Sequence, residues 1–201
     1  MSKTGEQTPI ESRRTAILGA AQTCFFQYGL DRTRMEDIGR LAQISRPGLY
    51  KHFENKSAIF LALARAFLVS CLQEAEVELQ RSSPVWKRIT AAFDVWSVKP
   101  LEMIVAAPHA DEIIRAGSGL AANVYREETE RFARILAGVL RDAARKGELN
   151  LRRAGLIASS AADLLVATVR GAKEDGKDPG LYRKRLVRLI RVFDCATSSS
   201  K

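Results

Sequence analysis

TRMEDIGRLAQISRPGLYKHFENK, residues 33–56, contains two predicted helix starts only a few residues apart. Thr33 is predicted to cap the first helix with Glu36 as its capping-box partner, and apolar residues then recur at helical spacing. Ser45 predicts the second N-cap, because Pro47 fits the first turn of a helix without losing a hydrogen bond. Only Gln43 and Ile44 remain for the turn, so the two helices must meet at a bend.

The second of these helices has two chemically different faces. At about 100° per residue, Leu49 and Phe53 fall on one side and are predicted to anchor the helix on a core. The remaining surface combines basic, aromatic and small residues: Arg46, Pro47, Gly48, Tyr50, Lys51 and His52. Lysine and arginine side chains can bind guanine edges or phosphates, and tyrosine and histidine side chains can donate hydrogen bonds to phosphate oxygens. Taken singly, each residue is equally typical of a solvated helix face; together they predict a helix that reads the DNA major groove.

Over about residues 13–63 the chain resembles the N-terminal DNA-binding domain of the TetR family of transcriptional regulators. The matching positions lie in three successive helices: Ile17, Leu18, Ala20, Ala21, Phe25, Phe26 and Gly29, then Thr33, Ile38 and Ala42, then Ser45, Gly48, Leu49, Tyr50, His52 and Phe53. Lys56 matches the family's phosphate-contacting lysine. Gly39 departs from the family's usual alanine, at a cost of up to about 1 kcal/mol of helix stability. Gln43 departs from its usual glycine.

The resemblance implies an all-α bacterial repressor of about nine helices. Its helix-turn-helix DNA-binding domain would span residues 8–55, with the motif itself at about 34–53, and a helical ligand-binding and dimerisation domain would span 56–195. The residues and the resemblance together predict these DNA contacts: Thr33, Arg34, Ser45, Arg46, Pro47, Gly48, Tyr50, Lys51, His52 and Lys56. Of these, Arg46, Pro47, Gly48 and Lys51 are expected to face bases, and Thr33, Tyr50, His52 and Lys56 to contact phosphates.

Composition agrees with a DNA-binding protein without proving one. The 201 residues carry a formal net charge of +9, which favours an anionic partner but does not determine a fold. Three widely spaced cysteines, Cys24, Cys71 and Cys195, favour a reducing cytoplasm. The first residues lack the apolar core of a signal peptide, and charges such as Arg65 and Asp163 interrupt the apolar stretches, so we expect no membrane association.

The rest of the chain is also predicted to be helical, with no period-2 alternation typical of strands. Expected helices cover about 9–28 after Thr8 as N-cap, 55–80, 84–99 ending before Pro100, 101–107, 120–146, 152–173 and 179–194 after Asp178 as N-cap. Residues 109–119 are expected to form a connection. The helix at 55–80 is long enough to link two domains.

The last two expected helices carry apolar residues on single faces: Leu164, Leu165, Leu186, Leu189, Ile190 and Phe193. One alternative is that these faces are buried within one subunit. The resemblance implies the other, a homodimer in which the two helices pair with their copies across a two-fold axis. Two-fold symmetry matches a palindromic operator, whose half-sites lie about 34 Å apart or a multiple of it.

By resemblance, large side chains of the second domain surround a pocket for a small-molecule inducer: Trp86, Phe93, Trp96, Met103 and Tyr125. The alternative is that they are ordinary core residues. His109, Asp111 and Glu112 have metal-ligand character but are more typical of a surface turn than of a closed site, so we expect no metal. No catalytic grouping or cofactor motif stands out, so we expect neither an enzyme nor a cofactor. The alternative function is a DNA-organising or protein-docking module that has the same DNA-reading helix-turn-helix and no inducer.

Overall fold

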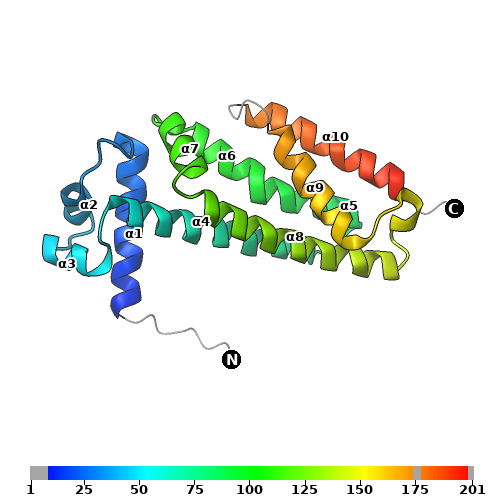
Figure 1. Ribbon diagram of the computed structural model, residues 1–201, viewed down its shortest axis with the longest axis horizontal. Helices are drawn as coiled ribbons and strands as arrows, with labels where there is room; N and C mark the ends of the chain where they lie inside the picture. Colours follow the sequence, from blue (N-terminus) through cyan, green and yellow to red (C-terminus); the bar gives the residue numbers. More distant parts are fainter. Residues whose placement is uncertain (1–8, 174–177, 199–201) are drawn as a thin grey trace. The chain divides into compact units, whose positions relative to one another are not determined.

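The computed structural model describes residues 9–173 and 178–198, and the elements in these ranges are helices joined by short turns, which confirms the all-α class (Figure 1). The predicted N-cap Thr8 lies outside the described residues. The chain divides into two compact units, one of Met1–Phe67 with Ile104–Val124 and the other of Leu68–Met103 with Tyr125–Lys201. The expected domain boundary at residues 55 and 56 stays a prediction, because the helix that starts there belongs to both units.

The first unit contains α1 (Pro9–Tyr28), α2 (Met35–Leu41), α3 (Arg46–His52), the first half of α4 (Lys56–Leu79) and α7 (Ala110–Ser118). Its apolar core has Ile17, Phe25, Ile38, Leu49 and Ile59 among its most deeply buried members. These residues recur at helical spacing on their helices, so each helix buries one face. As predicted, Leu49 and Phe53 anchor the second helix of the motif on this core.

The predicted connection at residues 109–119 is wrong, because residues 110–118 form α7. Its apolar face explains the helix: Ile113 is buried, and Ala116 packs against the core of the first unit. Ala121, directly after α7, is 3% exposed within the same core. Segment 110–121 is therefore part of the unit that carries the helix-turn-helix.

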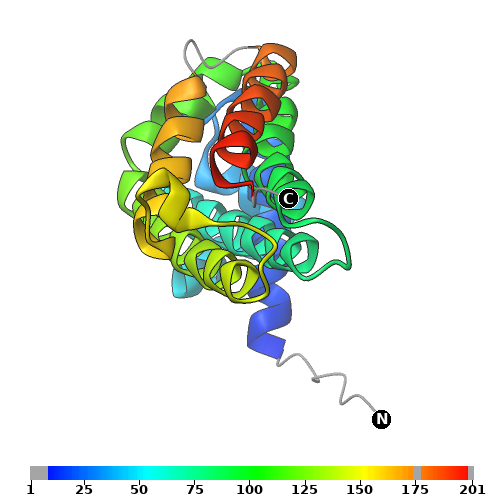
Figure 2. The ribbon, with the colours of Figure 1, turned by 90° about the vertical axis from the view of Figure 1, so that its right-hand side faces the viewer.

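The second unit contains the rest of α4 together with α5 (Val85–Phe93), the π-helical segment η1 (Asp94–Val98), most of α6 (Lys99–Val105), most of α8 (Ala122–Arg145), the 3-10 turn η2 (Leu151–Ala154), α9 (Ala158–Ala172) and α10 (Pro179–Thr197). Aromatic rings fill its centre: Phe132 meets Phe93 at 5.1 Å and Trp96 at 5.2 Å between ring centroids. In Figure 2, α9 in yellow to orange and α10 in red lie side by side. Asp178 caps α10 as predicted, since its Oδ1 accepts a hydrogen bond from Leu181 N at 2.9 Å.

Two expected helix boundaries in this unit are wrong. The helix that was predicted to end before Pro100 continues through it, because η1 widens the helix so that Lys99 N donates to Asp94 O, five residues back. The helix predicted from residue 152 starts instead at Ala158. Gly155 has a left-handed backbone, with φ of +68°, and separates the helix from η2.

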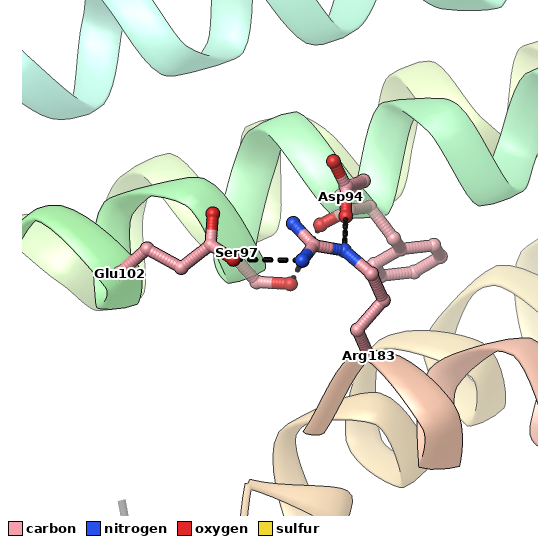
Figure 3. Close-up of polar contacts among 5 residues, drawn as sticks. Asp94, Ser97, Glu102 and Arg183 are labelled. Atoms are coloured by element: carbon pink, nitrogen blue, oxygen red, sulfur yellow. Dashed lines mark hydrogen bonds and ion pairs between the residues drawn. The ribbon is translucent and has the colours of Figure 1, made fainter. Parts of the chain in front are cut away.

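Arg183 ties α10 to the α5–α6 segment (Figure 3). Its Nε lies 2.7 Å from Asp94 Oδ1, and its Nη1 lies 2.7 Å from Glu102 Oε1. The hydrogen bond from Arg183 lowers the pKa of Glu102 below its ordinary value. Because the Arg183 side chain is 40% exposed, solvent screens both ion pairs.

Among the described residues, α4 is the one helix long and apolar enough to cross a membrane, with a window of mean hydropathy 1.6. Length and composition alone carry little weight here, because the core helix of a soluble protein passes the same criterion. In this chain the first half of α4 contributes Ile59 and Phe60 to the core of the first unit.

Candidate nucleic-acid interface

The start of α2 differs from the prediction by one residue. Thr33 belongs to the α1–α2 loop: its Oγ1 donates to Gly29 O at 2.6 Å, and its side chain is 2% exposed. The N-cap position is Arg34, whose backbone N donates to Asp37 Oδ2 at 3.0 Å. The chain has acidic residues at both 36 and 37, so the spacing rule alone selected the wrong one.

The turn between α2 and α3 has a strained residue and a close contact. Gln43 has a φ of +55°, a left-handed conformation that side chains with a Cβ disfavour. Ile44 N donates to Gly39 O at 2.9 Å, and a Cβ on residue 39 would lie 3.1 Å from Ile44 O. The glycine at 39 therefore leaves room for the turn to pass close to α2.

The helix α3 forms as predicted. Ser45 Oγ accepts a hydrogen bond from Gly48 N at 3.3 Å, and Pro47 lies in the first turn. Leu49 and Phe53 are 1% and 5% exposed, and they hold the helix on the core of the first unit.

The opposite face of α3 carries exposed charge and aromatic surface. Arg46, Pro47, Tyr50 and Lys51 are exposed, and His52 is half-buried. Arg46 Cζ lies 5.8 Å from the centroid of the Tyr50 ring, within the range of a cation–π contact. Arg46 Nη1 also lies 3.2 Å from Glu36 Oε1, but both side chains are more than half exposed, so DNA would displace this ion pair at little cost.

Gly48, which was expected to face outward, lies against the preceding turn, and its contact with bases stays a prediction. It is half-buried, and a Cβ on it would meet Ile44 Cγ2 at 3.0 Å and Ser45 Oγ at 3.1 Å. The reason is the cap itself, because the bond from Gly48 N to Ser45 folds this position back onto the turn. The glycine is needed for packing between the two helices.

The remaining predicted contacts lie at the edges of the motif. Ser45 and Arg34 are exposed at the starts of α3 and α2. Lys56 opens α4 after Asn55, whose Oδ1 accepts a hydrogen bond from Ala58 N at 2.9 Å, and Lys56 Nζ donates to Asp31 O at 3.1 Å. Thr33 lacks the exposure that a phosphate contact needs, and its assignment remains a prediction.

Sequence reasoning missed one cation near α3. The guanidinium of Arg14, an exposed residue of α1, lies 4.4 Å from the centroid of the Phe53 ring. It adds positive charge beside the C-terminal end of α3. The pair Arg13 and Arg14 in α1 was the available signal, but only the fold brings Arg14 to α3.

The predicted pocket residues do not line the cleft between α8 and α9 that is described below. Trp86, Phe93 and Trp96 are at most 7% exposed and form part of the aromatic core, Tyr125 stacks on Trp96 at 6.4 Å, and Met103 is 36% exposed. The burial of these three rings fits the core alternative, and their place in a ligand pocket stays a prediction. Burial raises the pKa of the Tyr125 phenol above its ordinary value.

A cleft of about 480 Å³ lies elsewhere in the second unit, between α8 and α9. Small, apolar and charged residues line it: Thr129, Glu130, Ala133, Arg134, Ala137, Ser159, Asp163, Val166, Ala167 and Arg170. None of the five predicted pocket residues is among them.

Half of the predicted dimer face is core. Leu165, Leu186 and Ile190 are at most 3% exposed within the single chain, because α9 and α10 pack against other helices of their own unit. Phe193 is half-buried with its ring centroid 6.1 Å from that of Trp86, and Leu189 is also half-buried. Leu164 is 47% exposed. The apolar residues that these helices expose most are Leu164, Leu181, Val187 and Val192.

No group of three or more potential metal ligands, whether of His109, Asp111 and Glu112 or of others, occurs in the described ranges 9–173 and 178–198. Asp111 and Glu112 lie in the first turn of α7. Glu112 accepts a hydrogen bond from the backbone N of Asp31 instead.

Comparison with known proteins agrees with this geometry. The profile of the bacterial regulatory proteins of the tetR family matches residues 17–63, which run from α1 into α4. This segment of the chain, which contains the helix-turn-helix, is therefore similar to the DNA-binding domain of that family.

Curated relatives match the same part of the chain. An HTH-type transcriptional repressor of Mycobacterium tuberculosis is 38% identical over 56 residues, and the HTH-type transcriptional regulator RutR of Escherichia coli is 37% identical over 59 residues. These matches cover 28% and 29% of this chain, and only 30% and 28% of the relatives.

Solved structures extend the likeness to the whole fold. A TetR-family regulator from Pectobacterium atrosepticum superposes with a TM-score of 0.73 at 15% identity, covering 98% of this chain and 100% of that one. The complex of SmeT with triclosan superposes with a TM-score of 0.62 at 22% identity, covering 94% and 93%. At these identities the likeness establishes the fold alone.

Proposed function

We propose that this protein is a cytoplasmic transcriptional repressor that binds a palindromic operator as a homodimer and is released by a small-molecule ligand. The observation that carries the proposal is α3, a capped helix anchored by Leu49 and Phe53 that exposes Arg46, Tyr50 and Lys51. Such a helix fits the major groove, where guanidinium and ammonium groups reach base edges. The repressor of M. tuberculosis that matches this domain supports the direction of regulation.

Within the interface, Arg46 and Lys51 are proposed to contact bases, with Pro47 against the groove. Tyr50, His52 and Lys56 are proposed to bind phosphates and fix the orientation on the duplex. Ser45 and Arg34 lie where the starts of α3 and α2 would face the phosphate backbone.

A homodimer is proposed because one short helix reads only a few base pairs, whereas two related by a two-fold axis read both half-sites of a palindrome. The exposed apolar residues of α9 and α10, among them Leu164, Leu181 and Val192, are the proposed contact surface. Replacing Leu164 with arginine is expected to shift the protein from dimer to monomer in sedimentation velocity. Loss of DNA binding in the same variant would agree with a dimeric reader.

The ligand is proposed to bind in the second unit, where the α8–α9 cleft has a volume within the range of small-molecule sites. Support comes from the SmeT structure, which is a complex with a small molecule, triclosan. Because α4 runs through both units, a ligand that favours one position of this helix would change the spacing of the two α3 helices. It can do so only by binding the DNA-incompetent conformation more tightly.

The decisive test is DNA binding by Tyr50→Ala and Lys56→Ala. The duplex used is one that the wild-type protein selects from a random-sequence pool, and affinity is measured at several salt concentrations. Both variants are expected to lose most of the affinity while keeping helicity, and Lys56→Ala is expected to reduce the slope of log affinity against log salt by about 0.9 per contact. Lys87→Ala, an equal charge change at an exposed residue of α5, is the control and should bind as the wild type does.

Unchanged affinity in both variants would refute the interface. A screen of small molecules by thermal shift then tests the ligand, because a molecule that binds only the folded state raises its melting temperature. DNA binding without sequence preference and without any stabilising ligand would favour the DNA-organising module instead.

A further inference from the structure

The loop between α1 and α2, residues 29–33, is held by side chains from three elements of the first unit. Thr33 Oγ1 closes the loop on itself by donating to Gly29 O. Lys56, from the start of α4, donates its Nζ to Asp31 O at 3.1 Å. Glu112, from α7, accepts a hydrogen bond from Asp31 N. The N–H and the C=O of one loop residue are thus each bound by a charged side chain.

The loop also fits closely against α7. Gly29 ends α1 with a φ of +82°, which favours glycine by itself. In addition, the space that a Cβ on residue 29 would occupy is already filled by the Glu112 carboxyl group, and the Cβ would lie 3.3 Å from His109 Cγ. Glycine at this position therefore allows α7 to approach the loop as well as the chain to turn.

Asp31 connects Glu112 to the proposed DNA contacts. An ammonium group has three donors, so the bond from Lys56 to Asp31 O leaves two for a phosphate while fixing the direction of the side chain. Two residues after Thr33, α2 begins, so the same loop sets the position of Arg34 and of the helix that supports α3. Hydrogen bonds to a carboxylate are about twice as strong as neutral ones, which suits Glu112 for holding a loop peptide in one orientation.

We propose that Glu112 is a positioning residue for DNA binding: its carboxylate on Asp31 N holds the α1–α2 loop so that Asp31 O aims Lys56 at a phosphate. This inference rests on the proposed function and adds a residue of α7, outside the helix-turn-helix, to the residues that determine DNA binding. Glu112 itself does not touch DNA.

The direction in which DNA affinity changes on removal of Glu112 distinguishes a positioning role from simple electrostatic repulsion. Removing a carboxylate near a DNA-binding surface weakens the repulsion of phosphates and should strengthen binding. If Glu112 positions Lys56, its removal must weaken binding instead. A glutamine at 112 retains an oxygen that accepts from Asp31 N, so it should restore most of the affinity.

The test measures the affinity of the full-length protein for the duplex selected by the wild type. Glu112→Ala is expected to bind about tenfold more weakly, and Glu112→Gln within about threefold of the wild type. The double variant Glu112→Ala with Lys56→Ala should bind no more than about threefold more weakly than Lys56→Ala alone, because both changes remove one contact. Glu74→Ala, an equal charge change at an exposed residue of α4 in the second unit, is the control and should leave the affinity unchanged.

Circular dichroism verifies the fold of each variant. If Glu112→Ala loses helicity, Glu112→Asp replaces it, since aspartate keeps the charge but withdraws it from Asp31 N, and the same loss is expected. The proposal is overturned if the folded Glu112 variant binds DNA as tightly as the wild type. It is also overturned if the loss of affinity caused by Glu112→Ala adds in full to the loss caused by Lys56→Ala. If Tyr50→Ala abolishes binding in the same assay while Glu112→Ala does not, the positioning role fails and the proposed function stands. If the wild type binds no DNA, both fail.

Discussion

Replacing Gln43 with glycine should stabilise the first unit. The φ of Gln43 is +55°, and a left-handed conformation costs a residue with a Cβ roughly 1–2 kcal/mol. Glycine avoids this strain but loses about 0.5–1 kcal/mol more conformational entropy on folding. The Gln43 side chain is exposed, and the bond from its backbone N to Arg40 O, 3.2 Å long, does not depend on the side chain. The expected net gain is about 0.5–1 kcal/mol.

Urea unfolding followed by far-ultraviolet circular dichroism measures this gain. Tryptophan fluorescence is unsuitable, because both tryptophans, Trp86 and Trp96, lie in the second unit. Gln43→Ala is the matched control: it shortens the same exposed side chain but keeps the Cβ, so its stability should stay within about 0.5 kcal/mol of the wild type. Equal stabilisation by alanine and glycine, or destabilisation by glycine, would refute the strain at this turn.

Two further predictions concern the second unit. Burial raises the pKa of Tyr182 to about 12, whereas a tyrosine in the unfolded chain ionises near pH 10. Between these two pH values the unfolded state binds fewer protons than the folded state. The free energy of unfolding should therefore fall by about 1.4 kcal/mol per pH unit from about pH 10 to 12. Tyr182→Phe should remove this part of the alkaline decline in urea midpoints, whereas Tyr28→Phe, at a residue that is 54% exposed, should not. Arg183→Met removes the ion pairs with Asp94 and Glu102 and should lower the free energy of unfolding by about 1 kcal/mol at low salt. The difference should shrink at about 1 M salt, and an equal loss at both salt concentrations would contradict an electrostatic origin.

Features that depend on neighbours in sequence were predicted well. Ser45, Pro47 and the spacing of Leu49 and Phe53 determine α3 through a cap, a fixed φ and a buried face, all within nine residues. Asp178 and Pro179 determine the start of α10 in the same way. Where two acidic residues competed for one cap, at 36 and 37, the spacing rule selected the wrong residue.

Features that depend on distant segments were not predictable. Nothing near Leu165, Leu186 or Ile190 distinguishes a side chain that packs inside its own unit from one that packs on a second copy. Large apolar side chains at helical spacing, such as Trp86, Phe93 and Trp96, give the same sequence pattern whether they line a cavity or fill a core.

The sequence alone specifies an all-helical protein with a helix-turn-helix near its N-terminus, because caps, turns and helical periodicity are local interactions. The tertiary structure decides what surrounds that motif. It brings Arg14 beside Phe53, and it brings Glu112, some eighty residues farther along the chain, to Asp31. Such contacts join residues with no shared local pattern, so they arise only when burial of α1, α4 and α7 around one apolar core places their polar side chains together.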